Sequence, residues 1–172
     1  MAEAKKAEEF IRVDQPWHVD YRVTAGPYGS RYLIHLKDKG KLLAARCPKC
    51  QRWFMPPTMV CSVCHVKVPE YPRSWVELSG KGYLVYWEKV VTPMMNVLGE
   101  VKPLTHLICT VHLDEGLSFG HLLDVAPDSD EEGKLKKGMR VELAVKPREE
   151  RIGSPEDIKY FKVLWDEPVK EL

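Results

Sequence analysis

Hydrophobic and polar positions alternate in short runs through the second half of the chain, from Trp75 onward. Alternation with a period of two places every second side chain on one face, so these runs predict β-strands. The runs lie at residues 75–78, 82–91, 104–113, 117–125, 140–145 and 160–165. Asp114-Glu115-Gly116 separates two of them as a hairpin turn, and polar residues 127–133 form a solvated loop. Regularly spaced strands with one interruption predict a small barrel.

The first part of the chain has a different pattern. Residues 1–9 are charged and poor in apolar side chains, so order is expected to begin near Phe10. Apolar patches follow at residues 21–23 and 32–43, with a turn-like stretch at residues 25–30 between them. We interpret the second patch as a helix that leads into a strand.

Residues 92–99 form an apolar stretch between two predicted strands, at a place where a loop is normally polar. One interpretation is a loop that folds over its own barrel. The other is a docking site for a partner or an acyl chain, because exposed methionines adapt to varied surfaces. The residues predicted to bind a partner are Met94, Met95, Val97 and Leu98.

The most specific chemical signal is a pair of Cys-x-x-Cys motifs, Cys47-Pro-Lys-Cys50 and Cys61-Ser-Val-Cys64. Each motif presents two thiolates to one point, and together they supply the four sulfur ligands of a tetrahedral Zn(II) site. Such a site has no open position for a substrate, so it predicts a structural and not a catalytic metal. Two disulfides, four separate thiols, or an iron centre of the rubredoxin kind are the alternatives. His65 is expected to be a surface residue.

The residues between the two motifs include Trp53, Phe54, Met55 and Met59, which are too apolar for a freely solvated loop. They are interpreted as the small core of a zinc ribbon and its contact with the barrel, with a binding surface as the alternative.

The other candidate catalytic groups lack partners at useful spacings. Cys109 shares a strand face with apolar residues, so it is expected to be buried and inert. His106 and His112 fall on the opposite face of that strand, and His121 lies on the next strand. We expect these histidines at surfaces or interfaces, because no Ser, Cys or carboxylate stands where it would make them general bases.

Composition and charge narrow the setting. With 44% hydrophobic and 30% charged residues, the chain suits a globular protein in water, and no stretch resembles a signal peptide or a membrane span. A cytoplasmic location is expected, where reduced thiols favour metal binding. Residues 1–73 carry 13 Lys/Arg and 7 Asp/Glu, whereas the remainder carries 13 and 18. A polyanion should therefore meet the first half.

The order of these parts resembles the zinc-ribbon and OB-fold proteins found beside thiolase-like enzymes and other acyl-CoA enzymes. The resemblance covers roughly residues 31–166. It rests on the two cysteine motifs together with Met55-Pro56-Pro57, Gly80-Lys-Gly82, Leu113-Asp-Glu-Gly116 and Gly138-Met-Arg-Val141. Gln51 stands where a glycine often follows the second cysteine. This difference concerns the conformation of the turn and leaves the four metal ligands unchanged.

The resemblance implies a mostly β protein. Its parts would be a helical or extended segment at residues 1–45, a rubredoxin-like zinc ribbon at 46–72 and an OB-fold barrel at 73–172. It also implies a non-catalytic subunit that forms a hetero-oligomer with a thiolase-like large subunit and helps to bind or channel acyl-CoA. The long segment before Cys47 is similar to that of members paired with thiolases of bulky acyl-CoA degradation, such as the benzylsuccinate pathway.

CoA carries phosphates, so its polar end is expected near the basic first half of the chain. The residues predicted to bind it are Lys39, Lys41, Arg46 and Arg52. A nucleic-acid-binding protein is the alternative, because zinc ribbons and OB barrels both occur in that class. The net charge of −5 on residues 74–172 makes nucleic acid unlikely as a partner. An independent enzyme ranks third.

Overall fold

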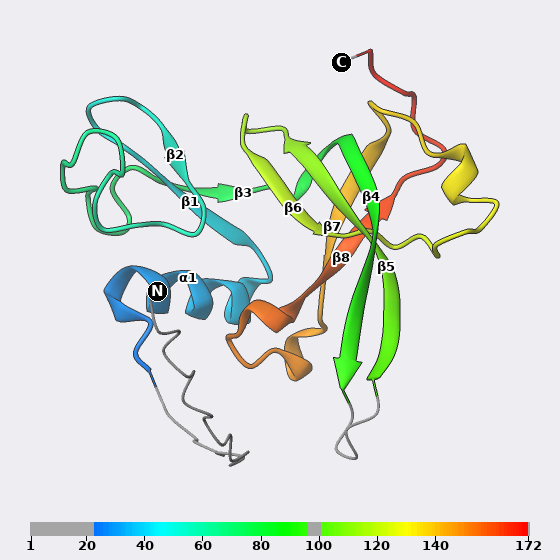
Figure 1. The fold of residues 1–172 in the computed structure, drawn as a ribbon. Coiled ribbons are helices and arrows are strands. Elements are labelled where there is room, and N and C mark those ends of the chain that lie inside the picture. Colours follow the sequence, from blue (N-terminus) through cyan, green and yellow to red (C-terminus); the bar gives the residue numbers. More distant parts are fainter. Residues whose placement is uncertain (1–22, 96–100, 172) are drawn as a thin grey trace, which may run out of the picture.

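A computed structural model describes residues 23–95 and 101–171 of the chain. The described part is mostly β, with two antiparallel sheets and one α-helix (Figure 1). Its helix and strands are α1 (Gly26–Lys39), β1 (Leu42–Arg46), β2 (Trp53–Phe54), β3 (Trp75–Leu78), β4 (Lys81–Met95), β5 (Val101–Leu113), β6 (Ser118–Leu122), β7 (Arg140–Val145) and β8 (Ile158–Val163). Short 3-10 helices lie at η1 (Glu132–Lys134), η2 (Arg148–Glu150) and η3 (Pro155–Asp157). The mostly β fold class predicted from the sequence is confirmed.

Helix α1 begins earlier than the sequence pattern predicts. Residues 25–30, expected to be a turn, mostly belong to its first turns, because Pro27 stands where a missing N–H costs the helix nothing. The helix ends at Gly40, which adopts the left-handed conformation and donates its N–H to the Leu36 carbonyl. In the described part of the chain, no helix is long and apolar enough to cross a lipid bilayer.

Two arginines after the barrel strand β7 hold the end of α1. The Arg151 guanidinium donates to the carbonyls of Leu36 and Lys37, at 3.2 and 3.0 Å. Arg148 donates to the Asp38 carbonyl at 2.9 Å. Carbonyls in the last turn of a helix lack the usual donor four residues later, so the arginines help to satisfy them and complement the negative end of the helix dipole. The helix is thereby tied to the barrel.

The smaller sheet has the strand order β2-β1-β3. Strand β3 pairs with β1 from Leu42 opposite Leu78 to Ala45 opposite Trp75. Strand β3 follows the predicted boundary between residues 72 and 73, whereas β1 precedes the cysteines, so the pairing crosses that boundary. The domain boundaries themselves stay a prediction.

The larger sheet has the order β6-β5-β4-β7-β8 and closes into a barrel. Its two outer strands meet through a parallel contact between Leu123, just after β6, and Phe161 of β8. A five-stranded, partly open barrel of this kind is the OB fold that the resemblance implies. The core holds alternate residues of the strands, with Leu84, Leu107, Val111, Val141 and Phe161 fully buried.

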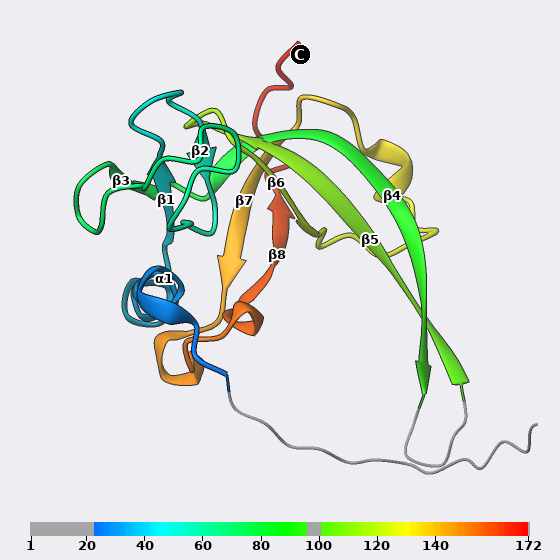
Figure 2. The same cartoon turned by 60° about the vertical axis from the view of Figure 1, so that its left-hand side comes forward.

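Strands β4 and β5 continue well beyond the barrel as a two-stranded arm. Only residues 81–83 of β4 pair with β7, and only residues 108–112 of β5 pair with β6. The pairing of β4 with β5 nevertheless reaches Met95 opposite Val101, and Figure 2 shows this hairpin curving away from the other strands. The first part of the predicted loop at residues 92–99 is therefore strand. Pro93 of β4 and Pro103 of β5 lie opposite each other, and both are tolerated because no other described strand pairs with the arm and requires a backbone N–H at these positions.

Candidate metal centre

The four cysteines of the two Cys-x-x-Cys motifs converge on one point. Their sulfur atoms all lie within 4.8 Å of one another. The Sγ atoms of Cys50 and Cys61 are 3.7 Å apart. Sulfurs bound tetrahedrally to zinc at about 2.3 Å are separated by about 3.8 Å, so the observed spacing fits a Zn(II) ion. The same four residues were predicted from their spacing in the sequence.

The two motifs fold in the same way. The N–H of Cys50 points to the sulfur of Cys47 at 3.5 Å, and the N–H of Cys64 points to that of Cys61 at 3.3 Å. In each motif the residue after the second cysteine donates its N–H to the carbonyl of the first at 3.0 Å. These repeated bonds place both pairs of sulfurs at the open side of a tight turn.

The residue after the second cysteine has a left-handed backbone in both motifs, with φ of 61° at Gln51 and 54° at His65. Glycine adopts this conformation without strain, which explains why it is common there. Gln51 forms the turn nevertheless, and its side-chain amide donates to the Pro48 carbonyl at 3.0 Å. The substitution for glycine therefore leaves the ligand geometry intact.

The thiols share their protons unevenly. Burial opposes ionisation of Cys47, but hydrogen bonds from the backbone of Cys50 and Lys49 and from neighbouring thiols outweigh it and lower its pKa to about 6. The pKa of Cys64 rises to about 12, because its thiol is hydrogen-bonded to Cys50, is buried, and lies near other thiols. Four adjacent thiolates need a cation to neutralise them, which a divalent metal ion supplies.

The centre is a structural zinc site. Four thiolates complete the tetrahedral coordination of Zn(II) and leave no position for water or substrate. Cys47 and Cys61 are fully buried in a small core with Tyr28, Ala45 and Val68. The metal thus replaces the apolar core that so small a unit lacks.

The apolar residues between the motifs divide between two cores. Trp53 and Met55 pack against the main barrel core, and Phe54 packs against the core beside the metal. Met59 is 48% exposed. The interpretation as a core and a contact with the barrel thus describes three of the four residues. An open cleft of about 700 Å³ remains between this segment and the β5–β6 turn, lined by Cys50, Trp53, Met55 and Leu117 among others.

The residues predicted to bind CoA form two separate pairs. Lys39 ends α1 and Lys41 precedes β1, whereas Arg46 ends β1 and Arg52 precedes β2. Arg46 lies five positions after Lys41 along an extended strand, which separates the two pairs by about 16 Å. The Arg46 guanidinium lies 5.2 Å from the centre of the Trp53 ring, and its Nε donates to the Gln51 carbonyl. CoA binding by these residues stays a prediction.

The residues predicted to bind a partner lie at the end of the arm. Met94 and Met95 are the last residues of β4. Val97 and Leu98 lie outside the described residues. Their role in binding stays a prediction.

The remaining candidate catalytic groups form no catalytic site in the described residues. Cys109 is 1% exposed, and burial raises its pKa to about 11, so its thiol is not ionised at neutral pH. His121 pairs with Cys109 across the strands, and burial lowers the pKa of this histidine. His106 and His112 lie on the outer face of β5, as predicted. These two histidines and Cys109 therefore lie on opposite faces of the strand.

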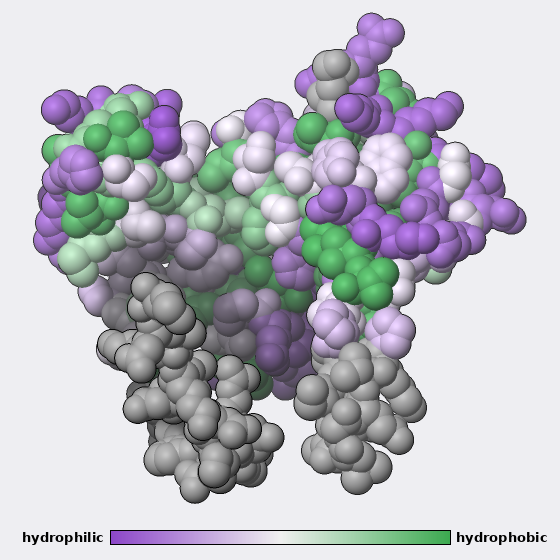
Figure 3. All heavy atoms as spheres, viewed as in Figure 1, coloured by the Kyte–Doolittle hydropathy of each residue, from purple (hydrophilic) through white to green (hydrophobic). Residues whose placement is uncertain are grey.

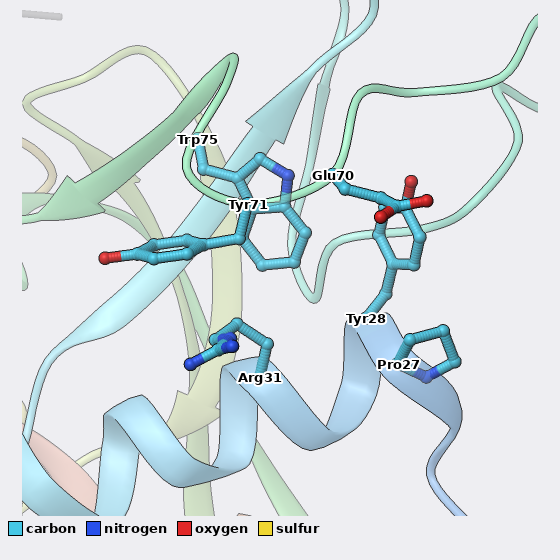
Figure 4. A pocket seen from close by; sticks show the side chains of 6 residues that line it. All are labelled: Pro27, Tyr28, Arg31, Glu70, Tyr71 and Trp75. Atoms are coloured by element: carbon cyan, nitrogen blue, oxygen red, sulfur yellow. The ribbon is translucent and has the colours of Figure 1, made fainter.

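Sequence reasoning missed one cluster of aromatic residues. Tyr71 lies beside Trp75 and, together with Tyr28, lines a pocket (Figure 4). Pro69 and Pro72 flank Glu70 and Tyr71, and a residue before proline favours an extended backbone, so the sequence indicates an extended segment here. In the sequence, these aromatic residues themselves were the only signal of a pocket. Tyr28 belongs to α1, about 40 residues earlier in the chain, so the sequence did not show that it meets Tyr71 and Trp75.

The fold and the centre together define a zinc-ribbon protein with an OB-fold barrel. Residues 35–70 match the family model described as "ChsH2, rubredoxin-like zinc ribbon domain". This match covers the metal centre and confirms the predicted type of ribbon. No curated protein matches the sequence.

Two solved structures are similar to this chain. One is named "Ltp2-ChsH2(DUF35) aldolase"; it is 21% identical with a TM-score of 0.51, over 83% of this chain and 98% of that one. The other is a protein of unknown function from the DUF35 family of Sulfolobus solfataricus, 19% identical with a TM-score of 0.47, over 80% of this chain and 86% of that one. The first of these two structures shares the fold of this chain over nearly its whole length.

Proposed function

We propose that this protein is the zinc-containing, non-catalytic subunit of a thiolase-type acyl-CoA acyltransferase complex. It helps to bind or channel acyl-CoA and shapes the active site of its partner. The thiolase-like large subunit supplies the nucleophile and the base. The long segment before Cys47 favours a partner that acts on bulky acyl groups, such as those of the benzylsuccinate pathway.

The observation that carries this proposal is the closed metal centre. Four thiolates occupy every coordination position, so the metal cannot activate water or polarise a carbonyl. The fifth cysteine, Cys109, is buried with a raised pKa, so it is no nucleophile. A chain built in this way acts through a partner.

The comparisons support a partner of enzymatic kind. The solved structure that shares the fold is named as an aldolase with two components, Ltp2 and ChsH2. The matching family model is also named for ChsH2. A role as one component of an acyl-CoA enzyme complex is consistent with both names.

The arm formed by β4 and β5 is the surface we assign to the partner. Val91 and Leu104 on the arm are 56% and 53% exposed. A two-stranded ribbon has little stability of its own, and an apolar one gains stability when a second surface covers it. The predicted contact residues Met94 and Met95 end this arm.

A nucleic-acid-binding role is not favoured. OB barrels bind oligonucleotides on the outer face of their second and third strands, which are β5 and β6 here. That surface needs basic residues and stacking aromatic rings. Within residues 104–112 and 118–122 the outward positions hold no Lys or Arg and no Phe, Tyr or Trp, being Leu104, His106, Ile108, Thr110, His112, Ser118, Gly120 and Leu122.

We also propose a cytoplasmic location. Zinc binding requires four thiolates, and an oxidising compartment would convert them to disulfides.

Assembly with a thiolase-like large subunit from the same organism tests the proposal. The two proteins should cosediment, and acyl-CoA turnover should require both. Replacing Met94 and Met95 together with aspartate should weaken assembly, because charge would be buried at the contact. Replacing Ile152 and Val169, two exposed apolar residues outside the arm, with aspartate is the matched control and should leave assembly intact.

The coenzyme contacts are tested in the assembled complex. Lys39→Glu with Lys41→Glu should raise the acyl-CoA concentration required for half-maximal activity and leave assembly unchanged. Lys136→Glu with Lys137→Glu makes the same charge change on an exposed turn before β7 and should have no effect. Turnover by the isolated chain, or normal assembly of the methionine variant, would contradict the proposal.

A further inference from the structure

The cluster of aromatic residues beside the metal centre encloses a pocket of about 120 Å³. In Figure 4 the indole of Trp75 hangs above α1, with Tyr71 on one side and Tyr28 on the other. The ring centres of Tyr28 and Tyr71 lie 5.4 and 5.7 Å from that of Trp75. Arg31 and Glu70 complete the walls.

The pocket is held in shape by contacts that its own rings make. The Trp75 indole N–H donates to the Pro69 carbonyl at 2.8 Å, and the Tyr28 hydroxyl donates to the Val68 carbonyl. Tyr28 and Val68 also pack in the small core with two of the metal ligands. Because these polar atoms already have partners, the rings offer a ligand mainly their apolar surfaces.

The size and charge of the pocket restrict what it can bind. An enclosed apolar cavity of about 150 Å³ accepts a benzene molecule, so this smaller pocket, which is open to solvent on one side, takes one ring of a planar ligand and leaves the rest outside. The Arg31 guanidinium lies 5.2 Å from the centre of the Tyr71 ring, and it would repel a second cation there. Aromatic rings and a planar guanidinium together favour a planar heterocycle, since nucleic-acid bases stack on both.

A second hollow adjoins the first and is lined by a basic helix face. It has a volume of about 190 Å³ and shares Arg31 and Tyr71 with the aromatic pocket. Arg31, His35 and Lys39 follow at intervals of four residues, so they form one row along α1. The row suits phosphate groups, whereas Glu70 on the other side of the pocket would repel them.

Two carboxylates border this row, and one of them, Glu77, already engages two of its three members. Glu77 lies 2.9 Å from the His35 ring and 3.9 Å from Lys39. Asp38 lies 4.0 Å from the Arg148 guanidinium. Arg31 forms no ion pair with any described residue, so its charge remains available to a ligand.

We propose that this site binds an adenine nucleotide, with the base stacked against the cluster of Tyr28, Tyr71 and Trp75 and the phosphates beside Arg31. The Glu70 carboxylate can accept a hydrogen bond from the amino group of the base. Adenine is the base that CoA carries, so the choice of base rests on the proposed function. The site then holds the nucleotide end of the coenzyme, while the acyl end reaches the partner subunit.

Calorimetric titration of the full-length, zinc-loaded chain with AMP and with CoA tests the proposal. Both should bind, and ribose 5-phosphate, which lacks the base, should bind at least about fivefold more weakly. Tyr71→Ala should weaken AMP and CoA binding at least about fivefold, because stacking on the ring is lost. Tyr86→Ala removes another exposed tyrosine, on β4, and should leave binding unchanged.

The charged row is tested separately. Arg31→Gln should weaken binding of AMP and of ribose 5-phosphate. Arg73→Gln makes the same charge change at an exposed residue that lines neither hollow, so it should leave binding unchanged. Equal binding of AMP and ribose 5-phosphate, or unchanged binding by Tyr71→Ala, would overturn the site.

The two proposals fail in different ways. A complex that assembles and turns over acyl-CoA normally with Tyr71→Ala would overturn the nucleotide site alone. Binding of AMP as predicted, without assembly with any thiolase-like subunit, would overturn the proposed function and leave a nucleotide site.

Discussion

The carboxylate of Asp114 and the guanidinium of Arg140 are joined by two parallel hydrogen bonds, each of 2.6 Å. Asp114 lies in the β5–β6 turn and Arg140 begins β7, so the ion pair ties two segments that are 26 residues apart. The guanidinium also lies 4.7 Å from the centre of the Tyr83 ring. The ion pair therefore joins the motifs at residues 113–116 and 138–141 directly.

The ion pair should make stability depend on pH in the acid range. The hydrogen bonds from Arg140 are the main cause that holds the pKa of Asp114 below its ordinary value of 3.8. A lowered pKa stabilises the fold at pH values above the unfolded pKa, and this contribution is lost as the pH falls through the folded pKa. Asp114→Asn should therefore lower the free energy of unfolding by about 1 to 2 kcal/mol at pH 7, with exposure of the carboxylate taken into account.

Urea denaturation at pH 7 and near pH 2 measures this effect. The difference between the variant and the original protein should shrink at the lower pH, because protonation of Asp114 weakens the ion pair. Asp130→Asn, at an exposed carboxylate that pairs with no cation among the described residues, is the control and should change little at either pH. A difference that stays constant with pH would rule out the ion pair as its source.

Asp157 should be a major determinant of how α1 attaches to the barrel. This carboxylate is fully buried and accepts hydrogen bonds from the N–H groups of Ile152, Gly153 and Ser154, at 3.1, 2.7 and 3.2 Å. Burial alone would raise its pKa, but these bonds outweigh burial and lower it. They also shape the loop that presents Arg151 to the end of the helix.

Asp157→Ala would leave three N–H groups without an acceptor, so it should cost about 2 to 3 kcal/mol of unfolding free energy. Amide hydrogen exchange should accelerate in the last turn of α1 as well as in the loop. Glu156→Ala changes an exposed carboxylate of the same turn and is the control. Exchange that accelerates in the loop alone would show that Arg151 does not depend on Asp157.

The zinc centre should hold the ribbon and the start of α1 together. Purified protein should contain about one zinc ion per chain, and Cys61→Ser should lose it, because three thiolates remain for a site that needs four. Exchange should then accelerate around Tyr28, which shares the core beside the metal. Elemental analysis and hydrogen exchange measure these effects.

Cys109→Ser is the matched control for the metal, since it removes a buried cysteine from the barrel instead of the ribbon. It should keep the zinc ion even if the barrel is destabilised. Disulfides without metal, in protein prepared under reducing conditions, would contradict a zinc centre.

Cys109 should be nearly unreactive in the folded protein. With a pKa of about 11, roughly one thiol in a thousand is ionised at pH 8, and the side chain is almost fully buried. Alkylation by iodoacetamide, followed by peptide mass spectrometry, should therefore be at least about 100-fold slower than at a cysteine introduced at exposed Ser118. Fast alkylation of Cys109 in the native state would reopen it as a nucleophile.

The sequence by itself determined the features that depend on local spacing. Four cysteines in two Cys-x-x-Cys motifs converge because each motif closes its own turn, and alternation identifies the barrel strands because side chains of a strand point to opposite faces in turn. The buried position of Cys109 follows from the same alternation.

Tertiary structure alone decided which distant residues meet. Lys41 and Arg46 are close in sequence, yet the extended strand between them keeps their charges apart. Tyr28 and Tyr71 share a pocket only because the ribbon packs on α1, and Asp114 meets Arg140 only because β4 pairs with β5 on one side and with β7 on the other. Composition near one residue does not encode such encounters, because they depend on strand order and on how the elements pack over the whole chain.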